Sequence, residues 1–313
     1  MLTYKTKIEL GTIVMPPTVA LRPFVKWAGG KTQILPEIRK IYPEGLGTKI
    51  TKYCEPFVGG GAVLFDVLSK YKFKEVYISD INAELIATYK SIRDNVEAVI
   101  DRLKEWQDEY SFLDGNGRKT VFAQRRARFN EIKSGAKGTV DEVGALFIFL
   151  NRTCFNGLYR VNAKNLFNVP MGKYANPFIC DEENLKNISR ALQKVQIVCG
   201  DFKESESFID LNTFVYFDPP YRPLSVTASF TSYTKDEFND DNQKELASYV
   251  HALCKKGTQV AVSNSDPKNT DENDNFFDDL YAGLTIKRIE ATRMINSNAK
   301  LRGKIKELLI YNH

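Results

Sequence analysis

The chain has 313 residues, of which 43% are hydrophobic and 27% are charged, and its formal net charge is +5. A chain of this length and composition can bury a full core and divide into a large and a smaller domain, which argues against disorder. The net charge is modest, and it fits a solvated surface as well as a face for a polyanion.

The histidines, the cysteines and the N-terminal segment exclude further classes. Only His251 and His313 are present, and the five cysteines lie far apart without a C-x-x-C pair. We therefore expect reduced thiols, no metal site and no His-centred triad. The apolar stretch 10–21 is broken by Pro16 and Pro17, and no run approaches the roughly 18 apolar residues of a membrane span. These features predict a soluble, cytoplasmic protein.

Alternating β and α patterns run through the first hundred residues. Residues 50–57 form an extended run that ends at three glycines, and residues 62–69 follow with helical spacing. A short strand over 75–79 is closed by Asp80, and 83–94 is again helical. Two β-α units in succession predict a parallel, doubly wound sheet with helices on both faces.

The character of the sequence changes between residues 96 and 195. Charged helical stretches lead to a Gly-rich linker at 134–138 and then to a dense polar and aromatic segment at 151–174. This block predicts an inserted, mainly helical domain. The remaining residues, 1–95 and 196–313, then form the other domain.

The β-α pattern returns after the insertion. Apolar runs that end in polar or Pro-rich turns predict three more strands, at 196–199, 213–217 and 259–263. Residues 285–291 and 307–311 could pair as an antiparallel edge. The acidic stretch 266–279 is interpreted as a solvated loop that leads into a helix.

The segment Asp218-Pro219-Pro220-Tyr221 follows an apolar strand, at the end where ligands of such sheets bind. An aryl amine is a poor nucleophile because its lone pair is delocalised into the ring. Asp218 and the Pro219 carbonyl can each accept one N–H, which turns the lone pair toward a methyl donor. The prolines keep that carbonyl rigid, and Tyr221 can stack on the base. The alternative is a turn after a buried strand, with Asp218 as a cap.

Residues 59–61 and Asp80 indicate a second ligand site. Three glycines at the end of the first strand let a ligand approach the backbone closely. Positions 62–64 are Ala, Val and Leu, so the spacing of a pyrophosphate-binding turn is absent. Asp80 ends the next strand, where a carboxylate can accept both ribose hydroxyls. A nucleoside without phosphates suits both facts, although three glycines alone are often only a tight turn.

Two further segments have competing interpretations. Gly29-Gly30-Lys31-Thr32 resembles the tail of a phosphate-binding loop, but Val25 stands where that motif requires glycine. Asp201 and Phe202 could hydrogen-bond to and stack on a purine, while a helix N-cap at Asp201 explains the aspartate nearly as well.

Together these residues resemble the Dam family, the DPPY, alpha-group DNA adenine methyltransferases. The resemblance extends from Pro23 to Tyr311, and its most specific segments are PFVKWAGGK at 23–31, EPFVGGG at 55–61, DIN at 80–82, FLNRTCFNGLYRVN at 149–162, FNVPMGKY at 167–174 and DPPY at 218–221. It implies an α/β fold with a Rossmann-like, S-adenosylmethionine-dependent methyltransferase sheet in residues 1–95 and 196–313. Residues 96–195 would be a mainly helical target-recognition domain.

The resemblance also implies roles for particular residues. The donor-binding set is Trp27, Lys31, Phe57, Gly59, Gly61, Asp80, Asp201, Phe202 and Asp218. The catalytic set is Asp218, Pro219, Pro220 and Tyr221. The DNA-binding set is Phe155, Asn156, Leu158, Arg160 and Tyr174.

The residue types of the insertion agree with those DNA-binding roles. Arg160 suits the guanine edge, Leu158 suits a thymine methyl, and Phe155 suits the gap left by an extruded base. The alternative for these three side chains is membership of an aromatic helix-loop core.

The sequence therefore predicts methyl transfer from S-adenosylmethionine to the 6-amino group of a flipped adenine in double-stranded DNA, and the resemblance implies GATC as the target sequence. No membrane or metal is expected, and a cognate restriction endonuclease is left open as a partner. The alternatives are a methyltransferase acting on RNA or on the cytosine amino group, and a non-catalytic DNA-binding module. An intact DPPY with Trp27, Lys31 and Asp80 argues against the non-catalytic alternative.

Overall fold

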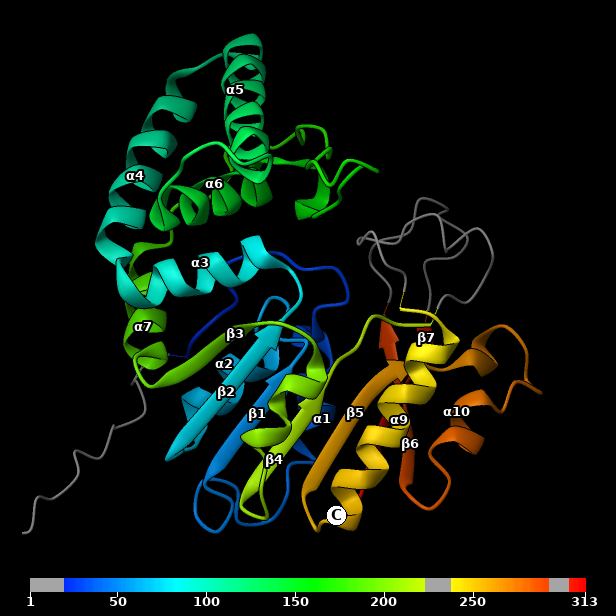
Figure 1. Ribbon diagram of the computed structural model, residues 1–313. Helices are drawn as coiled ribbons and strands as arrows, with labels where there is room; N and C mark the ends of the chain where they lie inside the picture. The colour runs from blue at the N-terminus through cyan, green and yellow to red at the C-terminus, as the bar shows by residue number, and fades with distance from the viewer. Residues whose placement is uncertain (1–19, 223–237, 293–303) are drawn as a thin grey trace, which may run out of the picture.

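The computed structural model describes residues 20–222, 238–292 and 304–313 (Figure 1). All but the last two residues of the apolar stretch 10–21 lie outside this part of the chain. The strands are β1 Lys52–Pro56, β2 Glu75–Asp80, β3 Val195–Cys199, β4 Thr213–Phe217, β5 Gln259–Ser265, β6 Thr285–Thr292 and β7 Lys304–Tyr311. The α-helices are α1 Leu35–Arg39, α2 Ala62–Lys70, α3 Ala83–Asp94, α4 Val96–Phe112, α5 Gly115–Lys133, α6 Val140–Thr153, α7 Glu182–Leu192, α9 Asp240–Lys255 and α10 Phe276–Leu280. The short 3-10 helices are η1 Lys31–Gln33, η2 Phe155–Gly157, η3 Phe202–Ser207 and η4 Pro267–Asn269.

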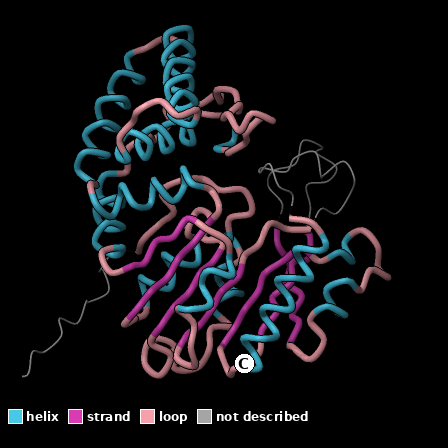
Figure 2. Tube along the Cα trace, in the orientation of Figure 1, coloured by secondary structure: helices cyan, strands magenta, loops and turns pink. Residues whose placement is uncertain are grey.

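The seven strands form one sheet in the order β3-β2-β1-β4-β5-β7-β6. Figure 2 shows the strands in magenta and the helices around them in cyan. Strands β1 to β5 are parallel, and β7 runs antiparallel to both β5 and β6. The prediction of a parallel, doubly wound sheet is thus confirmed. The expected antiparallel pair also forms, with β6 at the edge and β7 inside the sheet.

Alternate residues of the central strands supply two separate cores. On β4, Phe214 and Tyr216 join the cluster on the face that α1, α2 and α3 cover, whereas Val215 and Phe217 join the cluster beneath α9 and α10. Successive side chains of a strand point to opposite faces, and helices cover both faces here, so the whole strand is apolar and buried. The same alternation puts Asp218, the next residue but one, on the Tyr216 face.

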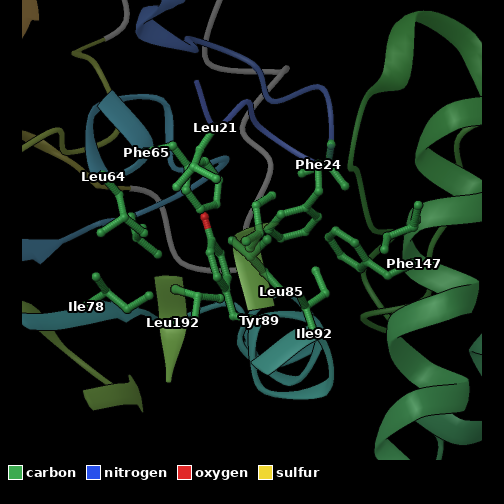
Figure 3. Packing of buried hydrophobic residues seen from close by; sticks show 14 of the residues in the cluster. Leu21, Phe24, Leu64, Phe65, Ile78, Leu85, Tyr89, Ile92, Phe147 and Leu192 are labelled. Carbon is green, nitrogen blue, oxygen red and sulfur yellow. The ribbon is translucent and has the colours of Figure 1, made fainter. Parts of the chain in front are cut away.

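Helices α4, α5, α6 and α7 lie between α3 and β3 in the sequence, and α4 to α6 stand beyond the carboxyl-terminal ends of the strands (Figure 1). Helix α3 joins them to the sheet, because its Tyr89 packs edge-to-face on Phe24 with ring centroids 4.9 Å apart. Phe147 of α6 faces the same cluster (Figure 3). One continuous apolar core thus joins the sheet to the helical insertion. Within the described ranges, no helix is long and apolar enough to cross a membrane.

The acidic stretch 266–279 leads into α10 and is exposed at 269–273, as expected, but some of its carboxylates form ion pairs with arginines. Asp266 is fully buried, and its carboxylate pairs with Arg288 of β6 at 3.0 Å. Asp274 pairs with Arg222, directly after the DPPY segment, at 2.6 Å. These ion pairs were not predicted, because Arg222 and Arg288 lie outside the acidic stretch.

Gly61 starts α2 in the left-handed region, with a φ of +75°. A Cβ at this position would overlap the Tyr89 hydroxyl and lie 2.9 Å from Cε2 of Phe65. We expect Gly61→Ala to lower the free energy of unfolding by about 2–4 kcal/mol, through left-handed strain and overpacking. Urea unfolding measures this loss. Gly135→Ala is the control, since Gly135 has a φ of +102° with nothing within 4 Å of its Cβ; equal losses would contradict the role of the contacts.

Candidate active site

Three neighbouring strand ends carry the residues of both predicted ligand sites. In the order β2-β1-β4, Asp80 ends β2, the glycines 59–61 follow β1, and Asp218 follows β4. These strands are parallel, so their carboxyl ends lie at the same edge of the sheet, where ligands of doubly wound folds bind. The fold therefore brings the glycine turn, Asp80 and the DPPY segment to one edge.

The Asp80 carboxylate is fixed by the backbone around it. Oδ2 accepts a hydrogen bond from the Gly59 N–H at 3.1 Å, and Oδ1 accepts one from the Asn82 N–H at 2.9 Å. Burial raises the pKa of Asp80, and these hydrogen bonds oppose the increase. Each carboxylate oxygen has two lone pairs, so Asp80 can still accept the hydroxyl groups of a ribose.

The turn between β1 and α2 is unusually shaped and lies against Trp27. Phe57 has a φ of +78°, a costly conformation for a side chain other than glycine, and its N–H donates to the Ser79 carbonyl at 2.9 Å. A Cβ on Gly59 would lie 2.8 Å from Cδ1 and Nε1 of Trp27. This backbone without side chains, next to an indole and a carboxylate, fits a nucleoside.

Asp201 and Phe202 complete the same edge, beyond β3. Phe202 is buried and stacks on Phe57 with ring centroids 5.5 Å apart. Asp201 caps η3 through its carboxylate, which accepts the Lys203 N–H at 3.0 Å, so the N-cap interpretation describes its observed contact. Ile81, which sequence reasoning missed, is 53% exposed directly after Asp80 and offers an apolar surface beside it.

Asp218 is held by two donors that share one of its oxygens. The Lys31 ammonium lies 2.7 Å from Oδ1, and the Ser263 hydroxyl donates to the same oxygen at 2.8 Å. Lys31 is only 4% exposed, and its ammonium also donates to the Gly29 carbonyl at 2.6 Å. The resemblance assigned Lys31 to the site of the methyl donor. In the structure, its side chain contacts Asp218.

Two acceptors of the DPPY segment are left open. Among the described residues, no donor contacts Oδ2 of Asp218 or the Pro219 carbonyl. The neighbouring Pro220 carbonyl, by contrast, accepts the buried Gln243 side-chain N–H at 3.0 Å. A group that offers two N–H donors can thus bind Asp218 and Pro219 without displacing a contact that the described residues make.

Tyr221 is oriented at both ends. Its hydroxyl donates to Oε2 of Glu307 at 2.8 Å, and the Lys31 ammonium lies 4.5 Å from its ring centroid. Burial, together with the charges of Asp218 and Glu307, holds the pKa of Tyr221 well above its usual value. The hydroxyl therefore stays protonated and remains a donor to Glu307.

Glu55, at the end of β1, is a buried carboxyl group on the same face of the sheet. It is 2% exposed, and the Tyr53 hydroxyl donates to its Oε2 at 2.6 Å. Burial raises the pKa of Glu55 to about 8, and the negative charge of Asp218 adds to this increase. Its carboxyl group is therefore largely protonated at neutral pH.

The DNA-binding residues predicted in the insertion differ in exposure. Phe155 is 51% exposed at the start of η2 and Arg160 is also exposed, so neither belongs to an aromatic core. Leu158 is half-buried and packs against that core, beside Phe167 and Tyr159. This is the position that the alternative interpretation, membership of an aromatic core, predicted for it. Asn156 and Tyr174 are also half-buried.

The buried side chain of Asn151 connects this loop to the segment before Trp27. Its Oδ1 accepts the Lys26 N–H, and its Nδ2 donates to the Lys26 and Gly157 carbonyls, all at 2.8 Å. Lys26 also lies over the Tyr174 ring, 4.5 Å from its centroid. Trp27 itself stacks on Tyr159 at 6.0 Å. One set of contacts thus connects the residues predicted to bind the methyl donor with those predicted to bind DNA.

Sequence reasoning missed Ser263, Gln243 and Asn151, all of which hold site residues in place. One signal was available for the first, because β5 ends in Ser263-Asn264-Ser265 and all three are buried. Polar residues at the carboxyl end of an otherwise apolar strand mark the edge where ligands bind. No comparable pattern distinguishes Gln243 or Asn151 within their helices.

The α/β sheet is Rossmann-like, its edge carries residues suited to a nucleoside, and an acidic-Pro-Pro-aromatic tetrad follows β4. These features define the protein as a methyltransferase. The chain belongs to the D12 class N6 adenine-specific DNA methyltransferase family, whose match covers residues 27–295. It is therefore a DNA adenine methyltransferase.

Similar proteins span almost the whole chain. It is 50% identical to the Type II methyltransferase M.MjaIII of Methanocaldococcus jannaschii, over 94% of this chain and 99% of that protein. It is 38% identical to the Type II methyltransferase M1.LlaDCHI of Lactococcus lactis subsp. cremoris, over 94% and 96%. It is 34% identical to the DNA adenine methylase of Haemophilus influenzae, over 94% and 95%.

Proposed function

We propose that this enzyme transfers a methyl group from S-adenosylmethionine to the 6-amino group of an adenine flipped out of duplex DNA, within GATC. The observation that carries the proposal is a pair of acceptors, Oδ2 of Asp218 and the Pro219 carbonyl, that no donor among the described residues contacts. An exocyclic amine has two N–H groups, so the donors and acceptors match in number.

The chemistry follows from that match. With one N–H on Asp218 and the other on Pro219, the amine is drawn from planar toward tetrahedral and its lone pair is localised. When bound, S-adenosylmethionine supplies an electrophilic methyl group on a positively charged sulfur. The amine lone pair would form the N–C bond while the S–C bond breaks and leaves its electron pair on the sulfur, and the nitrogen would then release one proton to water. Tyr221, fixed by Glu307, stacks on the base and holds it in register.

The donor would be held by the edge that β1, β2 and β3 form. Asp80 would accept the ribose hydroxyls, and the glycine turn beneath Trp27 would approach the methionine part closely. Phe57, Phe202 and Asp201 would surround the adenine. Asp218, paired with Lys31, would lie between the methyl donor and the target base.

The helical insertion, residues 96–195, would recognise the target sequence. Phe155, exposed at the start of η2, is suited to fill the space of the extruded base. Asn156, Leu158, Arg160 and Tyr174 would complete the DNA contacts. A cognate restriction endonuclease is proposed as the functional partner, which the name Type II methyltransferase on two relatives supports.

Arg160 should discriminate one base pair of the target. Asn168 holds its Nε at 2.8 Å, while its terminal nitrogens contact no acceptor in the described part of the chain, as bidentate binding of guanine requires. We expect Arg160→Ala to cost about 1–3 kcal/mol of discrimination at one base pair. Methylation of a duplex set with each position varied measures it, with the exposed Lys164→Ala on the same loop as control. An equal loss on every sequence would make Arg160 a phosphate contact.

The overall proposal is tested by incubating the enzyme with methyl-labelled S-adenosylmethionine and matched duplexes. Label should enter the GATC duplex and be absent when its adenines are replaced or when the same strand is RNA. Sequencing of the methylated adenines then identifies the site. Label in a duplex without adenine would contradict the proposed target, and methylation outside GATC would contradict the proposed sequence alone.

A further inference from the structure

The strand register places Ser263 directly beside Asp218. On β4 and β5, Tyr216 pairs with Ala261 and Phe217 with Val262, so the next pair of positions is Asp218 and Ser263. Both side chains lie on the Tyr216 face, because alternate residues of a strand share a face. Ser263 is fully buried, and therefore its hydroxyl must find its partners within the protein.

The hydrogen bonds of Ser263 run in a fixed direction. The Tyr216 hydroxyl donates to Oγ of Ser263 at 3.1 Å, and Ser263 donates in turn to Oδ1 of Asp218 at 2.8 Å. A serine has one proton, so accepting from Tyr216 leaves that proton for Asp218. Burial and the charge of Asp218 hold the pKa of Tyr216 well above its usual value, and the tyrosine remains the donor at the start of the chain.

This arrangement distinguishes the two oxygens of Asp218. Oδ1 receives Ser263 and the Lys31 ammonium at 2.7 Å, while Oδ2 is the oxygen that no described donor contacts. A lysine ammonium is a rotatable point charge and imposes little direction. A serine fixed on a buried strand does impose direction, because its hydroxyl cannot follow the carboxylate if it rotates.

We propose that Ser263 is a positioning residue for methyl transfer, which orients the Asp218 carboxylate so that Oδ2 faces the target amine. Tyr216 supports it by fixing the rotation of the Ser263 hydroxyl. This inference rests on the proposed role of Asp218 as an acceptor for the adenine amine. It adds two residues of the sheet interior to the machinery of the reaction.

The test compares Ser263→Ala with the wild type in single-turnover methyl transfer to a GATC duplex, which separates the chemical step from product release. We expect a rate about 10- to 100-fold lower, as for the loss of one hydrogen bond to a charged group. The dissociation constants for S-adenosylmethionine and for DNA should stay within about twofold, because the fully buried Ser263 would contact neither ligand. Ser263→Thr, which keeps the hydroxyl, should recover most of the rate.

Two further variants keep the result interpretable if Ser263→Ala is poorly folded. The double variant Tyr216→Phe/Ser263→Ala leaves no buried tyrosine hydroxyl without an acceptor, and it should be as slow as Ser263→Ala. Ser91→Ala is the matched control, since Ser91 is also buried but donates only to the Thr88 carbonyl within α3. Its single-turnover rate should equal that of the wild type.

The outcomes separate this inference from the proposed function. A wild-type single-turnover rate in Ser263→Ala, with Asp218→Ala inactive, would overturn the positioning role alone. A loss that appears only in the two dissociation constants would overturn it as well. Normal turnover in Asp218→Ala would instead remove the role of Asp218, on which the inference depends.

Discussion

Replacing Asp218 with alanine is expected to slow single-turnover methyl transfer by at least about a thousandfold, the upper range for losing one preorganised group at a reacting centre. The variant removes the acceptor for one amine N–H and also leaves the Lys31 ammonium and the Ser263 hydroxyl without their shared partner. The side chain follows β4 and is partly exposed, so the fold and most of the DNA affinity should persist. Labelled methyl transfer and DNA binding by titration measure the two properties separately.

Asp218→Asn is the sharper variant of the same experiment, because it keeps the shape of the side chain. Lys31 and Ser263 both donate, so they would hold the amide oxygen in the place of Oδ1. The amide NH₂ group would then face the target amine, and two donors cannot bind each other. We therefore expect Asn to be nearly as inactive as Ala. Turnover within about tenfold of the wild type would show that Asp218 does not accept an amine N–H at all.

The arrangement of the sheet was largely predictable, because most of its strands are short apolar runs that end at a polar residue or a turn. Strand β4 was predicted at its observed bounds, since the apolar run that follows Thr213 ends abruptly at Asp218. The position of β7 inside the sheet was not predicted. Its Leu308, Leu309 and Ile310 are all fully buried, and such a continuous apolar run is typical of a strand covered on both faces. The run indicates burial, but it does not identify the neighbouring strands.

The candidate site was predictable where one short segment carries the chemistry. The DPPY tetrad, the glycine turn and Asp80 each follow a strand, and parallel strands bring their ends together. The partners of these residues were not predictable in the same way. Ser263 lies beside Asp218 only through the register of β4 and β5, which 45 residues of chain separate. Local patterns do not specify such a register.

Glu55 should make the stability of the enzyme fall as the pH rises. Its pKa is about 8 in the folded protein and 4.5 for an ordinary glutamate, so the folded chain binds more protons than the unfolded chain between these values. The free energy of unfolding therefore decreases with pH through this window, by roughly 3–5 kcal/mol for this one group. Glu55→Gln should remove that decrease, because an amide has no proton to lose. Urea unfolding at pH 5, 6.5 and 8.5 measures the effect.

The comparison between variants isolates Glu55 from every other titrating group. At pH 8.5 the burial of a charged carboxylate is costly, so Glu55→Gln should be more stable than the wild type there. At pH 5 the wild-type carboxyl group is neutral and accepts from Tyr53, as the amide oxygen also can, so the two proteins should be closely matched. Glu75→Gln on the neighbouring β2 removes an exposed carboxylate and should leave the pH profile unchanged. A constant difference between Glu55→Gln and the wild type at all three pH values would mean that Glu55 keeps the same charge throughout this pH range, which would contradict the prediction.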